Sequence, residues 1–202
     1  MNKKPDVRYL TEVALLVAII LVMKLTGLTS IPVGPLNMTL SMVPIAIGAM
    51  LTGPLAGGIL GMVYGFTSFY DAVSGGSVMT GVFFQISPVH TFVLCVVMRA
   101  LVGVGAGWLF RGLHKIDPTK TVCYFITGLC TPLLNTALFM GYIVTVFYQT
   151  DFIQERVAAL GAANPIMFIV LLVGVQGLVE AATGAVIGGG VAKAVAKALG
   201  RE

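Results

Sequence analysis

The segment YLTEVALLVAIILVMKLTGL, residues 9–28, decides the fold class of this chain. It is 20 residues long and apolar apart from Thr11, Glu12, Lys24 and Thr26. At a rise of ~1.5 Å per residue, a helix of this length crosses a bilayer hydrocarbon core of ~30 Å. The segment therefore predicts the first helix of a membrane bundle.

The composition of the whole chain points the same way. Hydrophobic residues make up 57% of the 202 residues and charged residues only 10%, whereas soluble domains carry roughly 25% charged residues. The first helix does not resemble a signal peptide, because its apolar core is too long and no small-residue cleavage site follows it. We expect an all-α integral membrane protein that forms a single transmembrane domain over residues 1–202.

Apolar segments separated by turn signals predict a bundle of six transmembrane helices. Gly53-Pro54 is a strong turn signal between two segments of only ~15 residues, which are short for upright membrane spans. The predicted helices cover about residues 9–28, 38–52, 55–69, 88–113, 121–147 and 165–199.

Basic residues gather on one side of the predicted bundle. Nine of them lie at the N-terminus, between helices four and five, and at the C-terminus, whereas the opposite loops hold Arg156 alone. Because Lys and Arg are enriched in cytoplasmic loops, both termini are predicted to be cytoplasmic, with loops 29–37, 70–87 and 148–164 outside. The nine are Lys3, Lys4, Arg8, Arg111, Lys115, Lys120, Lys193, Lys197 and Arg201.

Four polar residues lie in the middle of predicted spans: Arg99 in the fourth helix, Asn135 in the fifth, and Gln176 and Glu180 in the sixth. A charge at this depth costs at least ~2.5–3.5 kcal/mol unless it is paired or hydrated. An internal Arg99–Glu180 ion pair would satisfy the charges. Polar groups on three separate helices exceed what packing needs, however, and favour a hydrated cavity for a polar ligand.

Further polar and aromatic side chains lie in the outer halves of the predicted helices. Ser87 and Tyr142 lie there, and Asn37 lies near the start of the second helix. His90, near the interface, is expected to be a structural hydrogen-bonding residue. Apolar walls of a cavity are expected from Tyr64, Phe66, Phe84 and Phe139.

Missing motifs exclude several function classes. The chain has no G-x-x-x-x-G-K-[ST] loop for ATP and no H-E-x-x-H zinc motif, and an intramembrane protease would need Ser74 to meet His90. Its three cysteines lie in apolar runs without C-x-x-C spacing, so we expect no metal site, cofactor or disulfide. Basic residues at helix ends predict no nucleic-acid partner. The sequence thus predicts a binding protein rather than an enzyme.

A solitary transporter driven by a proton gradient is the alternative, with Glu180 as the proton carrier. No inverted repeat of the kind common in secondary transporters is visible.

Ala14 and Ala18 lie four residues apart, hence on one face of the first helix. Small residues at this spacing let another helix approach closely in lipid. The pattern alone fits either a docking surface or ordinary packing within the bundle.

The run IPVGPLNMTLSMVPIAIGAMLTGPLAGGILGMVYGFTSF, residues 31–69, resembles the second and third helices of substrate-binding S-components of energy-coupling factor (ECF) vitamin transporters. The resemblance implies a bacterial cell-membrane protein that takes up a vitamin, docks through Ala14 and Ala18 on a transmembrane T-component with two cytoplasmic ATPases, and topples in the lipid bilayer. It also implies ligand contacts from Asn37, Ser87, Arg99, Asn135, Tyr142, Gln176 and Glu180.

Within that family the chain is most similar to the pantothenate-type branch. The similarity rests on residues 31–39, 83–88 (FFQISP), 98–103 (MRALVG) and 134–136 (LNT). The branch has asparagine where this chain has Gln176. Pantothenate is the expected ligand, with Arg99 on its carboxylate; riboflavin or another vitamin is the alternative.

Overall fold

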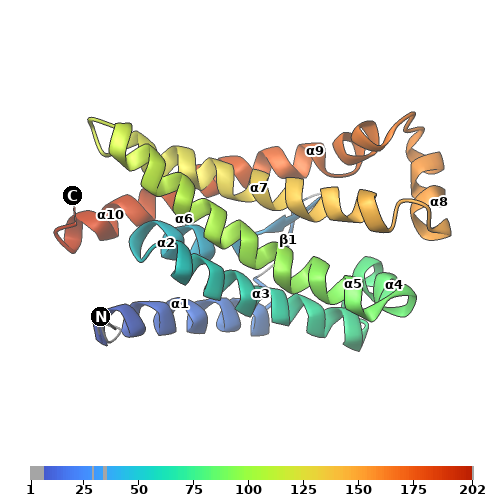
Figure 1. The fold of residues 1–202 in the computed structure, drawn as a ribbon, viewed down its shortest axis with the longest axis horizontal. Coiled ribbons are helices and arrows are strands. Elements are labelled where there is room, and N and C mark those ends of the chain that lie inside the picture. The colour runs from blue at the N-terminus through green and yellow to red at the C-terminus, as the bar shows by residue number, and fades with distance from the viewer. Residues whose placement is uncertain (1–6, 29, 34–35, 202) are drawn as a thin grey trace.

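The computed structural model of the protein describes residues 7–28, 30–33 and 36–201, and for residues 30–39 it describes the backbone alone. Long helices run side by side along the long axis of the molecule (Figure 1). The start of α1 (Val7–Leu25) and the end of α10 (Gly190–Ala198) lie at one end of the bundle, and the short helices α4 (Val78–Ile86), α5 (Pro88–Phe92) and α8 (Asp151–Leu160) lie at the other. The chain is thus an elongated helical bundle with its two ends together.

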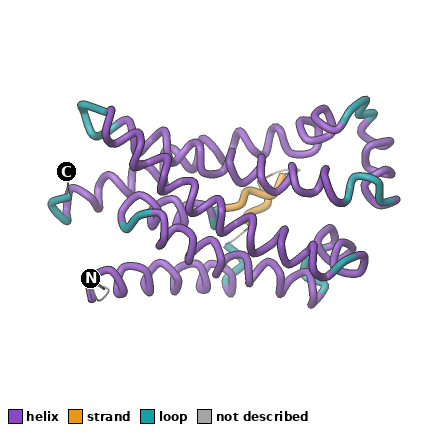
Figure 2. The backbone as a smooth tube through the Cα atoms, in the orientation of Figure 1, coloured by secondary structure: helices purple, strands orange, loops and turns teal. Residues whose placement is uncertain are grey.

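The first helix is followed by a small hairpin. Helix α1 spans Val7–Leu25, and strands β1 (Ser30–Val33) and β2 (Leu36–Thr39) pair antiparallel, with Asn37 opposite Pro32. The hairpin lies at mid-length of the bundle (Figure 2), where β2 contacts α9. The sequence predicted a turn-rich connection here and a helix from residue 38. Proline donates no backbone hydrogen bond and is tolerated in such an edge strand.

Helices α2 (Met42–Leu51) and α3 (Pro54–Ser74) meet at the predicted Gly-Pro turn. Gly53 has a φ of 101°, which favours glycine, and Pro54 occupies the first helical position, where its missing N–H is harmless. Helix α3 continues five residues past its predicted end at 69, until Gly75 ends it with a φ of 80°. The polar residues that suggested a loop there do not break the helix; glycine does.

Helix α4 (Val78–Ile86) lies where the sequence predicted a loop. It is followed by one continuous helical rod made of α5 (Pro88–Phe92), the π-helical turn η1 (Val93–Val97) and α6 (Met98–Ile116). Helix α7 then spans Val122–Val146. A π turn contains one residue more than a regular α turn, and such turns are frequent at functional sites.

The connection after α7 contains α8 (Asp151–Leu160), and the last rod combines α9 (Pro165–Thr183), the π turn η2 (Gly184–Gly189) and α10 (Gly190–Ala198). Within the described residues, three rods are long and apolar enough to cross a membrane. They are Pro88–Ile116, Val122–Val146 and Pro165–Ala198.

Asp117 holds the loop between α6 and α7. Its Oδ2 accepts hydrogen bonds from the backbone N–H groups of Thr121 (3.0 Å) and Cys123 (2.8 Å), and its Oδ1 accepts from the N–H (3.0 Å) and hydroxyl (2.7 Å) of Thr119. The bonds from Cys123 and Thr119 favour the charged form and hold the pKa of Asp117 well below its ordinary range. The carboxylate therefore fixes the start of α7.

Two buried apolar clusters fill the bundle. One gathers side chains of α1, α2, α3, α6, α7 and α10 around Leu16 and Leu60. The other gathers side chains of α4, η1, α7, α8 and α9, and within it Phe83 and Phe147 stack with ring centroids 4.3 Å apart. The gap between these clusters is where a cavity can form.

Glycines let backbones touch at two helix crossings that flank the cavity. A Cβ added at Gly61 of α3 would collide with the carbonyl oxygen of Arg99, and a Cβ at Gly128 of α7 would collide with that of Gly184. Only a residue without a Cβ fits these contacts. The small residues thus fix where α6 passes α3 and where η2 passes α7.

Candidate functional site

Arg99, at the start of α6, is the centre of the candidate site. Only 8% of the residue is exposed, and its Nη1 donates to the carbonyl oxygen of Cys95 in the π turn at 3.2 Å. The guanidinium Cζ lies 4.6 Å from the ring centroid of Tyr64 and 4.9 Å from that of Phe139. Aromatic faces stabilise a desolvated cation, so Arg99 is held in place by two rings and one carbonyl.

A cavity of about 190 Å³ opens beside this arginine. It lies between the two apolar clusters, since Tyr64 belongs to one and Met140 to the other. Its walls come from α3, α4, α6, α7 and α9. The lining residues are Tyr64, Met79, Arg99, Asn135, Thr136, Phe139, Met140, Val173, Gln176, Gly177 and Glu180.

Glu180 brings a carboxylate into the cavity from α9. It is 5% exposed, and its Oε1 accepts a hydrogen bond of 3.0 Å from Nε2 of Gln176, one turn earlier. This pairing follows from the four-residue spacing noted in the sequence. Three ion pairs between described side chains, Arg8–Glu12, Lys24–Asp71 and Glu12–Arg201, lie outside the cavity, and none of them joins Arg99 to Glu180.

Two polar atoms of the lining are buried without a hydrogen-bond partner among the described residues. They are Nε of Arg99, a donor, and Oδ1 of Asn135, an acceptor. Buried polar groups are nearly always hydrogen-bonded, and an unsatisfied one calls for an explanation. A ligand with both an acceptor and a donor would satisfy this pair.

Four of the seven predicted ligand residues thus meet in one cavity, and two others lie outside its lining. Ser87 caps the start of α5, where its Oγ accepts from the backbone N–H of His90 at 3.5 Å. The hydroxyl of Tyr142 lies 2.8 Å from Nδ1 of His90. Ser87 thus caps its own helix, Tyr142 joins α7 to α5, and His90 forms the structural hydrogen bonds expected of it. The side chain of Asn37 lies outside the described residues.

The predicted aromatic walls divide in the same way. Tyr64 and Phe139 line the cavity, whereas Phe66 packs edge-on against Phe92 with ring centroids 6.1 Å apart. Phe84 likewise packs against a neighbouring ring rather than the cavity.

Several other residues of the cavity lining were not predicted from the sequence. Thr136 and Met140 follow Asn135 on α7, as Val173 and Gly177 flank Gln176 on α9. Reading one helical face outward from the polar residues would have found them. Met79 lies on α4, which was predicted as a loop.

Ala14 and Ala18 are both exposed on α1. Their neighbours Leu15 and Ile19 are exposed as well, by 62% and 40%. Neither alanine is taken up by packing inside the bundle, and together they leave a shallow apolar strip on the outside of the molecule.

The sequence was then compared with known proteins. Residues 8–188 match the family model described as ECF transporter, substrate-specific component. A search of curated proteins finds no match. The matched range contains every lining residue of the cavity and both alanines of α1.

Proposed function

Because the chain belongs to the family of substrate-specific components of ECF transporters, we propose that it captures a small vitamin or vitamin precursor, with pantothenate the best candidate. The family is one of transporter components and not of enzymes. In this proposal the cavity beside Arg99 is the ligand site, and energy for uptake comes from separate ATPase subunits, since the chain has no ATP-binding loop of its own.

The observation that carries the proposal is the buried guanidinium of Arg99. A cation that lines a cavity, with a free Nε donor and no carboxylate in ion-pair contact among the described residues, suits an anionic ligand group. Charge-assisted hydrogen bonds to such a group are about twice as strong as neutral ones. The carboxylate of pantothenate is of this kind.

The rest of the lining suits the remaining groups of the same ligand. Pantothenate also has an amide and two hydroxyls. The unsatisfied Oδ1 of Asn135 can accept from the amide N–H, Gln176 can donate to its carbonyl, and Glu180 can accept from a hydroxyl. These assignments extend the resemblance to the pantothenate-type branch to individual atoms.

The size of the cavity supports a small ligand. At about 190 Å³ it lies below the ~300–1,000 Å³ of pockets that hold drug-sized molecules. A flexible acid such as pantothenate is a better match for this space than riboflavin with its three fused rings.

The proposed architecture has six membrane spans and cytoplasmic termini, and it docks through the Ala14–Ala18 strip. Helices α1, α2 and α3 complete the count begun by the three long apolar rods. The exposure of both alanines supports a close approach by a helix of the T-component. The ligand would then enter from the end that carries α4 and α8.

A thermal-shift screen of the purified protein against B-vitamins and their precursors tests the ligand. Binding to the native state alone raises its stability by about 2.7 kcal/mol at a hundredfold excess over Kd. We expect a shift with pantothenate. A shift with another vitamin would discard pantothenate and keep the family role. Uptake by this chain alone in vesicles, driven by a pH gradient and lost in Glu180→Gln, would instead favour the solitary transporter.

A further inference from the structure

Ion pairs join α1 to the rest of the bundle near both of its ends. At the inner end Glu12 pairs with Arg201, and at the outer end Lys24 pairs with Asp71. Glu12 and Lys24 lie roughly 18 Å apart along the axis of α1, at ~1.5 Å per residue. The exposed Ala14 lies between them.

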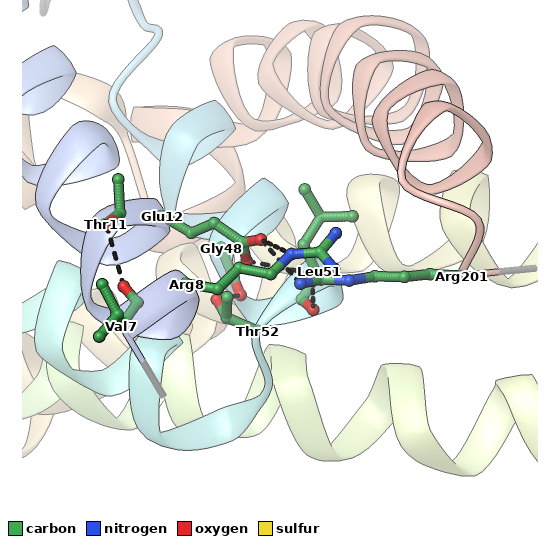
Figure 3. Close-up of polar contacts among 8 residues, drawn as sticks. All are labelled: Val7, Arg8, Thr11, Glu12, Gly48, Leu51, Thr52 and Arg201. Carbon is green, nitrogen blue, oxygen red and sulfur yellow. Dashed lines mark hydrogen bonds and ion pairs between the residues drawn. The ribbon is translucent and has the colours of Figure 1, made fainter. Parts of the chain in front are cut away.

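The inner pair connects the two ends of the chain (Figure 3). Arg201, just after α10, donates from Nη2 to Oε1 of Glu12 at 2.7 Å and from Nη1 to Oε2 at 3.1 Å. Its Nη1 also donates to the carbonyl oxygen of Leu51, the last residue of α2, at 3.0 Å. This bidentate contact fixes both the orientation of the Arg201 guanidinium and its distance from the Glu12 carboxylate. Arg201 lies beyond the residues that match the family model.

The outer pair connects α1 directly to α3. Nζ of Lys24 contacts Oδ2 of Asp71, and their side chains are 28% and 25% exposed. Partial burial reduces the screening of such a pair by water and salt. The pair joins the last turn of α1 to the last turn of α3.

Between the two pairs, α1 packs against the bundle along one narrow face. Its buried residues are Val13, Leu16 and Ile20. On the side facing α3 an open apolar groove separates the helices. It is lined by Val17, Leu21, Lys24, Leu25, Val63, Phe66, Thr67 and Tyr70. Lipid tails are as apolar as these side chains, so no hydrophobic force holds α1 against the bundle at the groove.

We infer that Glu12–Arg201 and Lys24–Asp71 are positioning pairs that hold the Ala14–Ala18 strip of α1 in a fixed place for the transmembrane partner. This inference rests on the docking role in the proposed function. A helix that is held in its bound position before contact loses less freedom on binding. None of the four residues lines the cavity, so the pairs act on assembly and leave ligand binding alone.

The first test is a charge-reversal cycle at the outer pair. Lys24→Asp and Asp71→Lys are each expected to weaken assembly with the T-component and ATPases about tenfold, and the double variant is expected to recover most of the loss. The ligand-induced thermal shift should be unchanged in all three. Arg156→Met, which removes a half-buried cation on α8 that takes part in neither pair, is the matched control. Single variants that assemble normally, or a double variant that does not recover, would overturn the inference.

The second test needs no partner. Spin labels at Ala14→Cys on α1 and Trp108→Cys on α6, both exposed positions, report the distance between α1 and the bundle in a background whose native cysteines are replaced by alanine. We expect a narrow distance distribution with intact pairs, a broad one in Arg201→Met, and partial recovery in Arg201→Lys. An unchanged distribution in Arg201→Met would contradict the inference. Where a charge reversal does not fold, the neutral pair Lys24→Gln with Asp71→Asn replaces it.

A third variant separates the two proposals. Ala14→Leu, which leaves both ion pairs intact, should abolish assembly if the strip is the docking surface. If it does so while the ion-pair variants assemble normally, the inference alone is wrong. If Ala14→Leu itself assembles normally, the docking role fails and the inference fails with it.

Discussion

The guanidinium of Arg99 lies over the ring of Tyr64, 4.6 Å from its centroid, while both side chains line the same cavity. The ring comes from α3 and the cation from α6, and the two helices are in close contact at Gly61. Cation–π contact with a desolvated cation contributes about 2 kcal/mol or more. Tyr64 therefore helps keep a charge where water does not fully solvate it.

Replacing this ring should weaken ligand binding. Tyr64→Leu removes the aromatic face and leaves Arg99 free to change its orientation, so we expect a loss of about 0.5–2 kcal/mol in affinity. Tyr64→Phe keeps the face and should bind within about twofold of the wild type. Isothermal titration with the ligand found in the screen measures both, and equal losses in the two variants would contradict a role for the ring face.

Removing the cation should have a larger effect. Arg99→Gln is expected to cost roughly 2–5 kcal/mol of affinity, because it leaves the buried anionic group of the ligand without a partner. Arg156→Gln, at a half-buried position of α8 outside the cavity, is the matched control. Melting curves of both proteins distinguish weak binding from misfolding; an Arg99→Gln protein that folds and binds normally would remove Arg99 from the site.

Substitutions on the α1 strip should separate binding from assembly. Ala18→Leu places a large side chain where close helix contact is proposed, so uptake should be lost while ligand affinity stays nearly unchanged. Val175→Leu, at an exposed position of α9, makes a similar change elsewhere on the apolar surface. Co-purification with the T-component and titration with ligand report the two properties, and full uptake by Ala18→Leu would exclude the strip as a docking site.

The crossing of α7 and η2 should not accept a methyl group. Gly128→Ala would force the backbone of Gly184 away, at a cost of about 1–3 kcal/mol in stability. Gly141→Ala lies on the same helix with nothing within 4 Å, and should be neutral or stabilising by up to ~1 kcal/mol. Thermal melts of the two variants at one pH give the comparison, and similar melting temperatures would contradict the packing argument.

The loop before α7 should be sensitive to acid. The folded pKa of Asp117 lies below that of the unfolded chain, about 3.9 for an aspartate. Its carboxylate therefore adds stability above that pH, and the contribution is lost as the pH falls through the folded value. Asp117→Asn should melt lower than the wild type near pH 7, with the difference narrowing toward pH 3. A constant difference across that range would argue against the carboxylate.

The lining residues that the sequence predicted are mainly polar residues within otherwise apolar helices. Arg99, Asn135, Gln176 and Glu180 are costly in apolar helices wherever those helices pack, so their presence alone indicates a shared polar cavity. For Ser87 and Tyr142 the sequence does not distinguish a ligand contact from a structural hydrogen bond. A polar residue near a helix end can satisfy a backbone N–H or a neighbouring ring nitrogen, and only tertiary geometry decides between that and a ligand.

The fold shows the same division. Gly53-Pro54 and Gly75 set the two ends of α3 through local backbone chemistry. The turn at Gly53-Pro54 was predicted from the sequence for this reason. The hairpin at 30–39 depends on pairing between two four-residue strands. Helix α4 depends on packing that buries Phe83 against Phe147. The second of these contacts joins residues far apart in the sequence, so no short window of sequence encodes it.

The two π turns make the direction of later side chains depend on the number of residues in each turn. Each residue turns an α-helix by about 100°, so the extra residue in η1 sets the direction in which every later side chain of α6 points. The one in η2 does the same for α10 and Arg201. Deleting one residue from either turn would leave hydropathy and composition almost untouched, yet it would rotate one part of the rod against the other. These segments should therefore tolerate almost no change in length over evolution.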